Sequence, residues 1–259
     1  MRQKALIVSL KGIKLSKMEK ILLSKEKPWG VILFKRNLKS FIQIKNLTSK
    51  IKRLTKNKNF PILIDEEGKE VTRLKELINH NVSANFFGGL FKINKYFCLN
   101  LLKHYINSMS LTLKNLGINI NTLPVLDVLR NNTNKVIGNR SFSKDKKIVK
   151  ELGLAILENL HKNKISGVIK HIPGHGASNL DSHKMLPKVS LSPKKLNNID
   201  FYPFKISGAK LAMTAHILYM NLDNKNPATF SRKIIKNVIK KKLKFKGILL
   251  SDDISMKAL

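Results

Sequence analysis

The chain has 259 residues, of which 50 are Lys or Arg and 16 are Asp or Glu, giving a formal net charge of +34. Hydrophobic residues make up 42% of it, which excludes a disordered polycation. The apolar runs are shorter than the ~18 residues of a membrane span, and we interpret the first residues as a strand, not a signal peptide. The single cysteine, Cys98, excludes an intramolecular disulfide and a multi-cysteine metal site, so we expect a cytoplasmic protein.

The high positive charge raises the alternative of a nucleic-acid-binding protein. The lysines are spread along the whole chain, however, and no alternation of aromatic and basic residues indicates a surface on which bases stack. We therefore expect a globular protein with a lysine-rich surface and no specific nucleic-acid partner.

Short apolar runs of strand type alternate with amphipathic helical patterns along the chain. The strands are expected at residues 5–10, 31–34, 61–64, 118–126, 167–171, 212–216 and 247–250. The helices are expected at residues 15–23, 97–116, 148–160 and 234–243, the first opening with a capping box of Ser16 and Glu19. Continuously apolar strands between helices form parallel sheets. We predict one α/β domain over residues 1–259, a TIM-type (β/α) barrel that is incomplete because the eighth strand is missing.

Polar or charged residues follow five of these strands at the point where each strand ends. They are Asp65, Glu66 and Glu67, then Asp127, then Lys170 and His171, then His216, and last Ser251, Asp252 and Asp253. In a barrel, the carboxyl ends of all strands meet at the face that holds the active site. The sequence therefore predicts one pocket lined by carboxylates, imidazoles and a lysine.

The strongest motif is KHIPGHG at residues 170–176, followed by Asp-Ser-His at 181–183 and Leu-Pro at 186–187. Further motifs lie at residues 30–37, 65–73, 124–128, 137–142, 226–229 and 247–258. Together they resemble the bacterial β-N-acetylglucosaminidases of glycoside hydrolase family 3 that serve peptidoglycan recycling. The resemblance covers nearly the whole chain, and a series of motifs in one order is far more specific than any one of them.

The resemblance implies a retaining exo-β-N-acetylglucosaminidase that acts on cell-wall turnover fragments, GlcNAc-1,6-anhydro-MurNAc with or without peptide. It assigns the nucleophile to Asp252, with Asp253 as the alternative because successive strand residues point to opposite faces. It assigns the proton donor to His183, oriented by Asp181, since an imidazole with a pKa of about 6.5 can donate a proton and later accept one. The structural alternatives are a helix cap at Asp252 and an ordinary polar loop at 181–183.

The resemblance also implies a set of substrate-binding residues: Asp65, Arg73, Arg140, Lys170 and His171. A guanidinium donates to paired hydroxyls, and a carboxylate accepts from two at once. For Arg36, Asp127, His175 and His216 we expect structural roles at strand ends and in loops.

No cofactor is implied, but a zinc site is an alternative because His171, His175 and His183 fall close together with Asp181. Proline and glycine at residues 173–176 break any helix there, so the i, i+4 geometry of a helical HxxxH zinc site fails. We expect no metal.

Two features depart from the family pattern. Lys69 and Glu70 stand where the family has Gly and Arg, which would strain Lys69 if its φ is positive and would invert a charge at Glu70 if the Arg makes a buried ion pair. The chain also stops at Leu259, where relatives continue through an eighth strand. We expect an open seam beside the first and seventh strands, which an oligomer can cover. A degenerate, non-catalytic sugar-binding relative is therefore the alternative function.

Overall fold

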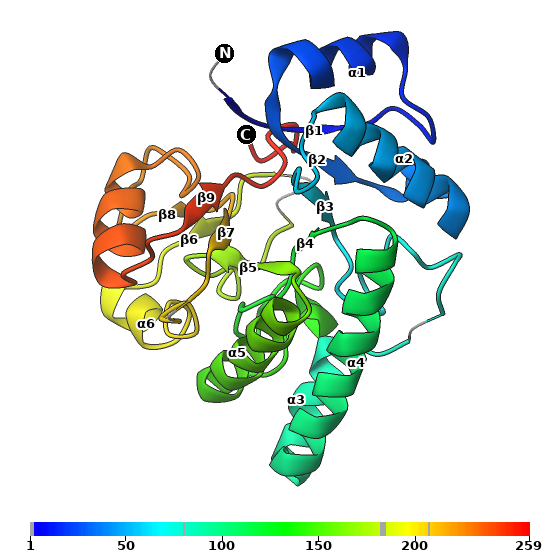
Figure 1. Ribbon diagram of the computed structural model, residues 1–259. Helices are drawn as coiled ribbons and strands as arrows, with labels where there is room; N and C mark the ends of the chain where they lie inside the picture. Colours follow the sequence, from blue (N-terminus) through cyan, green and yellow to red (C-terminus); the bar gives the residue numbers. More distant parts are fainter. Residues whose placement is uncertain (1–2, 80, 182–184, 207) are drawn as a thin grey trace.

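The computed structural model describes residues 3–79, 81–181, 185–206 and 208–259. Seven strands form one parallel sheet in the order β1-β2-β3-β4-β5-β7-β9. They are β1 (Lys4–Ser9), β2 (Pro28–Leu33), β3 (Ile62–Ile64), β4 (Ile120–Asn121), β5 (Ser166–Ile172), β7 (Leu211–Thr214) and β9 (Ile248–Leu250). Each overlaps one predicted strand, so the predicted incomplete parallel barrel is confirmed. The sheet curls with helices outside it (Figure 1), and β1 and β9 form its two edges.

The predicted strand at 118–126 is shorter than expected. Only Ile120–Asn121 forms regular ladder pairs, and Val125 makes an isolated bridge to Lys170. Pro124 lacks an N–H and cannot donate to a continuous ladder, which explains the interruption. Two short strands that no pattern predicted, β6 (Lys188–Val189) and β8 (Leu218–Tyr219), pair with each other outside the main sheet.

The helical segments are α1 (Lys17–Ile21), η1 (Leu22–Glu26), η2 (Lys35–Asn37), α2 (Phe41–Leu54), α3 (Ala84–Ile93), α4 (Lys95–Asn115), η3 (Gly138–Arg140), α5 (Lys146–Lys162), α6 (Pro193–Asn198) and η4 (Ile234–Lys242). The four predicted helices are confirmed, and so is the capping box, in which Ser16 Oγ accepts from the Glu19 N–H and Glu19 Oε2 from the Ser16 N–H. None of the helices in the described part of the chain combines the length and hydropathy that crossing a bilayer requires.

Two apolar clusters hold the sheet in place. The larger cluster packs the helices against the outer face of the sheet. Helix α2, which was not among the predicted helices, contributes Ile44, Leu47 and Ile51 to it. The smaller cluster is formed by Leu63, Ile120, Val168, Leu211, Met213 and Leu250. Leu63 lies between two residues of the larger cluster along β3, as the period of two in a strand requires. The central strands β3, β4, β5 and β7 are therefore buried, whereas the edge strand β1 is largely exposed.

Candidate active site

A cavity of about 830 Å³ is lined by residues at the carboxyl ends of β2, β3, β5 and β9. All five predicted substrate-binding residues line it: Asp65, Arg73, Arg140, Lys170 and His171. Asp252 and Asp253 line it as well. Its wall also includes side chains of β1 and β9, so the cavity extends between the two edge strands. The structure thus brings together most of the side chains that the strand-end pattern selected, whereas Glu66, Asp127 and His216 do not line this cavity.

Asp65, which follows β3, is the acidic centre of one half of the site. Its Oδ2 accepts a hydrogen bond from Arg73 Nη2 at 2.7 Å, and its Oδ1 accepts one from Thr122 Oγ1 at 2.5 Å. Lys170 Nζ donates to Thr122 Oγ1 at 2.8 Å and lies 3.6 Å from Asp65 Oδ1. Burial alone would raise the pKa of Asp65, but Lys170 and Arg73 outweigh it and hold that pKa well below its usual range. Asp65 therefore stays ionised, with lone pairs that can accept from sugar hydroxyls.

Glu67 is the centre of the other half. Its two carboxylate oxygens accept from Arg140 Nε and Nη2, each at 2.8 Å, and Lys170 Nζ lies 2.5 Å from Oε1. Burial opposes ionisation of Glu67, yet the charges of Arg140 and Lys170 lower its pKa to about 2. Arg140 Nη1 also donates to the Val136 carbonyl at 2.9 Å. Arg140 thus forms a bidentate pair with Glu67, and only its remaining N–H groups can reach a substrate.

Asp127 organises the two histidines of the KHIPGHG segment. It is fully buried, and its Oδ2 lies 2.7 Å from His171 Nδ1 while its Oδ1 accepts from the His175 N–H at 2.6 Å. Burial would raise the pKa of Asp127, but its interactions with His171 and His175 keep the pKa below its ordinary value. An ionised carboxylate only accepts, so His171 carries its proton on Nδ1. Burial lowers the pKa of His175 to about 4, so this ring is neutral at pH 7.

Asp252 and Asp253 follow β9 and have different surroundings. Asp253 Oδ1 accepts from the Ser255 N–H at 2.9 Å and from the Ser255 hydroxyl at 2.6 Å. Asp252 Oδ1 accepts from the Asp253 N–H at 2.8 Å. The capping role that the sequence left open for Asp252 is therefore taken by Asp253, within a turn. Both residues line the cavity, and Asp253 Oδ1 is the carboxylate oxygen that is engaged within the turn.

Of the predicted acid–base pair, the structure describes Asp181 but not His183. Asp181 is not among the described residues that line the large cavity. The segment before Asp181 is well anchored, however. Thr133 Oγ1 donates to the Gly176 carbonyl at 2.6 Å, and Asn134 N donates to the Ser178 carbonyl at 2.9 Å.

Of the four residues of the zinc alternative, the structure describes His171, His175 and Asp181, whereas His183 lies outside the described residues. In the described part of the chain, no cluster of three or more His, Cys, Asp or Glu side chains is arranged to hold a metal ion. Asp127 already engages His171 Nδ1, and the rings of His171 and His175 lie 5.6 Å apart, edge to face.

Lys69 and Glu70, the two residues of the third-strand loop that depart from the family pattern, cause neither of the expected problems. Gly68 adopts the positive φ in this loop, at 137°, and Lys69 does not have a positive φ, so the expected strain is absent at Lys69. Glu70 is exposed and accepts from Asn139 Nδ2 at 3.2 Å, so no buried charge is inverted there.

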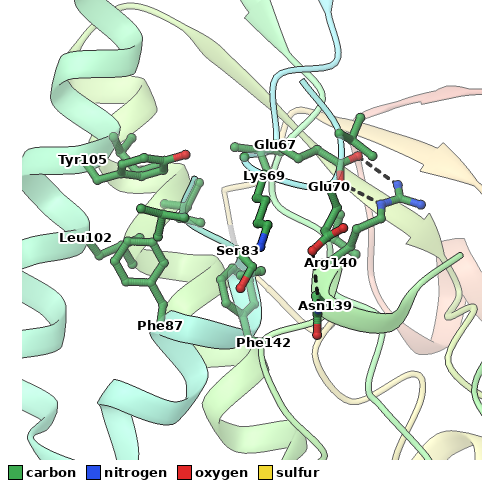
Figure 2. A pocket seen from close by; sticks show the side chains of 18 residues that line it. Glu67, Lys69, Glu70, Ser83, Phe87, Leu102, Tyr105, Asn139, Arg140 and Phe142 are labelled. Carbon is green, nitrogen blue, oxygen red and sulfur yellow. Dashed lines mark hydrogen bonds and ion pairs between the residues drawn. The ribbon is translucent and has the colours of Figure 1, made fainter. Parts of the chain in front are cut away.

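The same loop closes a second, much smaller cavity of about 20 Å³, roughly the space of one water molecule. Figure 2 shows Phe87, Leu102 and Tyr105 along one side of it and the Glu67–Arg140 pair along the other. Burial, together with the charge of the nearby Glu66, raises the pKa of Tyr105. The Glu67–Arg140 pair therefore separates this apolar space from the large cavity.

The sequence profile of the glycosyl hydrolase family 3 N-terminal domain matches residues 2–259. The chain belongs to glycosyl hydrolase family 3. Among curated proteins, the β-hexosaminidase of Neisseria meningitidis serogroup A is 36% identical over 231 residues, which is 88% of this chain and 63% of that protein. The β-hexosaminidase of Stenotrophomonas maltophilia is 29% identical over 259 residues, covering 98% of this chain and 75% of that protein. The chain thus spans less than two thirds of the Neisseria protein.

A solved structure shows the same fold. NagZ from Neisseria gonorrhoeae, in complex with N-trifluoroacetyl-D-glucosamine, matches with a TM-score of 0.92 and 32% identity. The match covers 98% of this chain and 74% of the NagZ chain. The resemblance stated from the motifs and the predicted barrel are both confirmed by this comparison.

Three residues of the site were given no substrate-binding or catalytic role from the sequence: Glu67, Thr122 and Asp127. Glu67 carried a usable signal, because it lies two residues after Asp65 and a period of two places both on one face of the chain. Asp127 follows an apolar run, as the other strand-end residues do, but its role as the partner of two histidines depends on tertiary contact. Thr122 carried no signal of its own.

Proposed function

We propose that this protein is a retaining exo-β-N-acetylglucosaminidase. The observation that carries the proposal is the convergence of the Asp65 and Glu67 clusters, His171 and Asp252 on one cavity at the strand ends. Relatives named β-hexosaminidase and a structural neighbour that binds an N-acylated glucosamine support the same substrate class.

The proposed mechanism has two steps. The carboxylate of Asp252 forms a bond to the anomeric carbon while the glycosidic C–O bond breaks, and His183 gives its proton to the leaving oxygen. Water then attacks the anomeric carbon, His183 takes a proton from that water, and the bond to Asp252 breaks. We propose that Asp181 orients His183.

Binding of the terminal sugar is assigned to Asp65, Arg73, Arg140, Lys170 and His171. Three cations surround two carboxylates there, and every one of the charged groups is held by a neighbour before substrate arrives. Such preorganisation reduces the cost of ordering these side chains when a sugar binds. We propose as the substrate a disaccharide fragment such as GlcNAc-1,6-anhydro-MurNAc, with or without peptide, and the likeness to proteins named β-hexosaminidase supports its terminal sugar. We place this activity in the cytoplasm, where such turnover fragments are reprocessed.

The test is hydrolysis of an aryl β-N-acetylglucosaminide by the 259-residue protein, with Asp252→Asn and Asp253→Asn alongside. We expect turnover by the wild type, a loss of more than about a thousandfold in Asp252→Asn, and retention of most activity in Asp253→Asn. With Asp252→Ala, sodium azide should restore release of the aryl group and give the α-glycosyl azide. A cooperatively folded wild type that binds N-acetylglucosamine but never turns over would favour the alternative, a degenerate sugar-binding relative.

A nucleic-acid function is tested separately by RNA binding against salt concentration. We expect affinity that arises from the diffuse positive charge to be lost at physiological salt. An oligomer that covers the two edge strands remains a prediction, and light scattering in the same buffer measures it.

A further inference from the structure

His216 and the motif at residues 226–229 have no place in the proposed chemistry, and neither His216 nor Thr229 lines the large cavity. His216 lies two residues beyond the end of β7 and is 1% exposed. Thr229 lies in the loop that returns to the same strand end, where the Ala228 N–H donates to the Ile217 carbonyl at 2.8 Å. Both therefore lie near the carboxyl end of β7, the strand that pairs with β9, and outside the cavity lining.

The His216 ring joins this loop to the backbone at the end of β9. Its Nε2 lies 3.1 Å from the carbonyl oxygen of Asp253, and its Nδ1 lies 2.7 Å from Thr229 Oγ1. A carbonyl only accepts, so Nε2 carries the proton. In the neutral ring Nδ1 is then an acceptor, and Thr229 donates to it.

The Thr229 hydroxyl is itself held by its surroundings. Thr214 Oγ1, from the last residue of β7, lies 2.9 Å from Thr229 Oγ1, and the Ala215 carbonyl lies 3.2 Å from it. With the Thr229 proton directed to the shorter contact at His216, Thr214 is the donor to Thr229. The chain of bonds runs from Thr214 through Thr229 and His216 to Asp253, in one direction.

The end of this chain is next to the proposed nucleophile. Asp253 is bonded at both ends of its backbone: its carbonyl accepts from His216, and its N–H donates to Asp252 Oδ1 at 2.8 Å. We infer that His216 and Thr229 are positioning residues that fix the Asp252 carboxylate for attack through the Asp252–Asp253 backbone. This inference rests on the proposed function, because it assigns to Asp252 the role of nucleophile.

A displacement of a reacting atom by about 1 Å can reduce a rate a hundredfold, so such an anchor should affect the rate of bond formation and not sugar binding. The measurement is trapping of the enzyme by the 5-fluoro glycosyl fluoride of N-acetylglucosamine. In this step an Asp252 oxygen bonds to the anomeric carbon while the C–F bond breaks and fluoride leaves. Fluoride needs no proton from the enzyme, so the step reports on the nucleophile and not on His183. Intact mass spectrometry follows the labelled protein.

The decisive pair of variants is Thr229→Val, which keeps the shape and removes the hydroxyl, and Thr229→Ser, which keeps the hydroxyl. We expect the trapping rate to fall about tenfold or more in Thr229→Val and to stay within about threefold of wild type in Thr229→Ser. The inhibition constant of free N-acetylglucosamine should change by less than about threefold in both. His216→Leu should behave as Thr229→Val does, and His216→Gln, which keeps an N–H near the Nε2 position, should recover part of the rate.

His104→Gln, on the exposed face of α4, is the matched control and should leave trapping unchanged. Equal trapping rates in wild type and Thr229→Val would overturn the inference, and so would equal losses in the Val and Ser variants. A loss of sugar affinity as large as the loss of rate would also overturn it. A folded wild type that is neither trapped nor active would instead overturn the proposed function, and the inference with it.

Discussion

His171 Nδ1 lies 2.7 Å from Asp127 Oδ2, a contact between a cavity-lining ring and a fully buried carboxylate. The contact fixes the tautomer in which Nε2 carries the acceptor lone pair. It also connects the strand-end site to the loop of residues 173–178, because the same carboxylate accepts from the His175 N–H. Asp127 therefore supports the site without needing to touch a substrate.

Asp127→Asn should lower kcat/KM toward an aryl β-N-acetylglucosaminide. The amide keeps the volume but turns an N–H toward His171 Nδ1 and removes a charge-assisted hydrogen bond of about 1.5–3 kcal/mol, which corresponds to roughly 10- to 100-fold in rate. Asp145→Asn, at the N-cap of α5, is the control that should leave kcat/KM unchanged. Wild-type kcat/KM in Asp127→Asn would show that the tautomer of His171 does not matter.

Glu67→Gln should destabilise the fold. Glu67 is the common partner of Arg140 and Lys170, and Lys170 is 3% exposed, so neutralising Glu67 leaves buried cations undercompensated. Breaking a buried pair in this way costs about 3–5 kcal/mol of unfolding free energy, which urea denaturation measures. Glu76→Gln removes the exposed pair with Lys35 and should cause no measurable change. Equal stability of the two variants would contradict the buried-pair account.

The unfolding free energy should decrease on acidification before the carboxylates titrate. The pKa of His175 is about 4 in the folded protein and near 6.5 in the unfolded chain, so the unfolded state binds more protons between these values. The stability that the neutral His175 contributes is fully present above pH 6.5 and is lost as the pH falls toward 4. By pH 5, about 2 kcal/mol of unfolding free energy has been lost.

Urea unfolding of wild type and His175→Asn at pH 7 and pH 5 isolates this effect. The variant should lose less stability between the two pH values than the wild type. Asp65 and Glu67, whose pKa values are lowered, contribute stability that is lost only as the pH falls below their unfolded values near 4, so they act in a separate window. An identical pH dependence in wild type and variant would rule out His175 as its source.

Gly176→Ala should destabilise the protein by about 2 kcal/mol or more, because a Cβ there would lie 1.9 Å from the Val128 carbonyl oxygen and the backbone would have to move. Gly89→Ala is the matched substitution, at an exposed position of α3 where nothing lies within 4 Å of an added Cβ. It should stabilise the helix by about 0.5–1 kcal/mol. Thermal unfolding measures the stability of both variants. An unchanged stability of Gly176→Ala would mean that the loop at 173–178 can move to accommodate the added Cβ at little cost.

Much of this architecture follows from local pattern. Continuously apolar runs separated by helical stretches determine a parallel sheet, and the parallel arrangement places every strand's carboxyl end at one face. That is why Asp65, Lys170, His171 and Asp252 could be placed in one cavity from the sequence. The capping box of α1 is equally local, because Ser16 and Glu19 are three residues apart.

The pairing of the charged groups was decided only by the tertiary structure. Arg140 was expected to bind substrate, yet its closest partner is Glu67, 73 positions away. Asp127 meets His171, and His216 meets the Asp253 carbonyl, through contacts 44 and 37 positions apart. Periodicity states which face a residue occupies, but which donor meets which acceptor depends on strand register, on the path of each loop and on the burial that makes an unpaired charge costly.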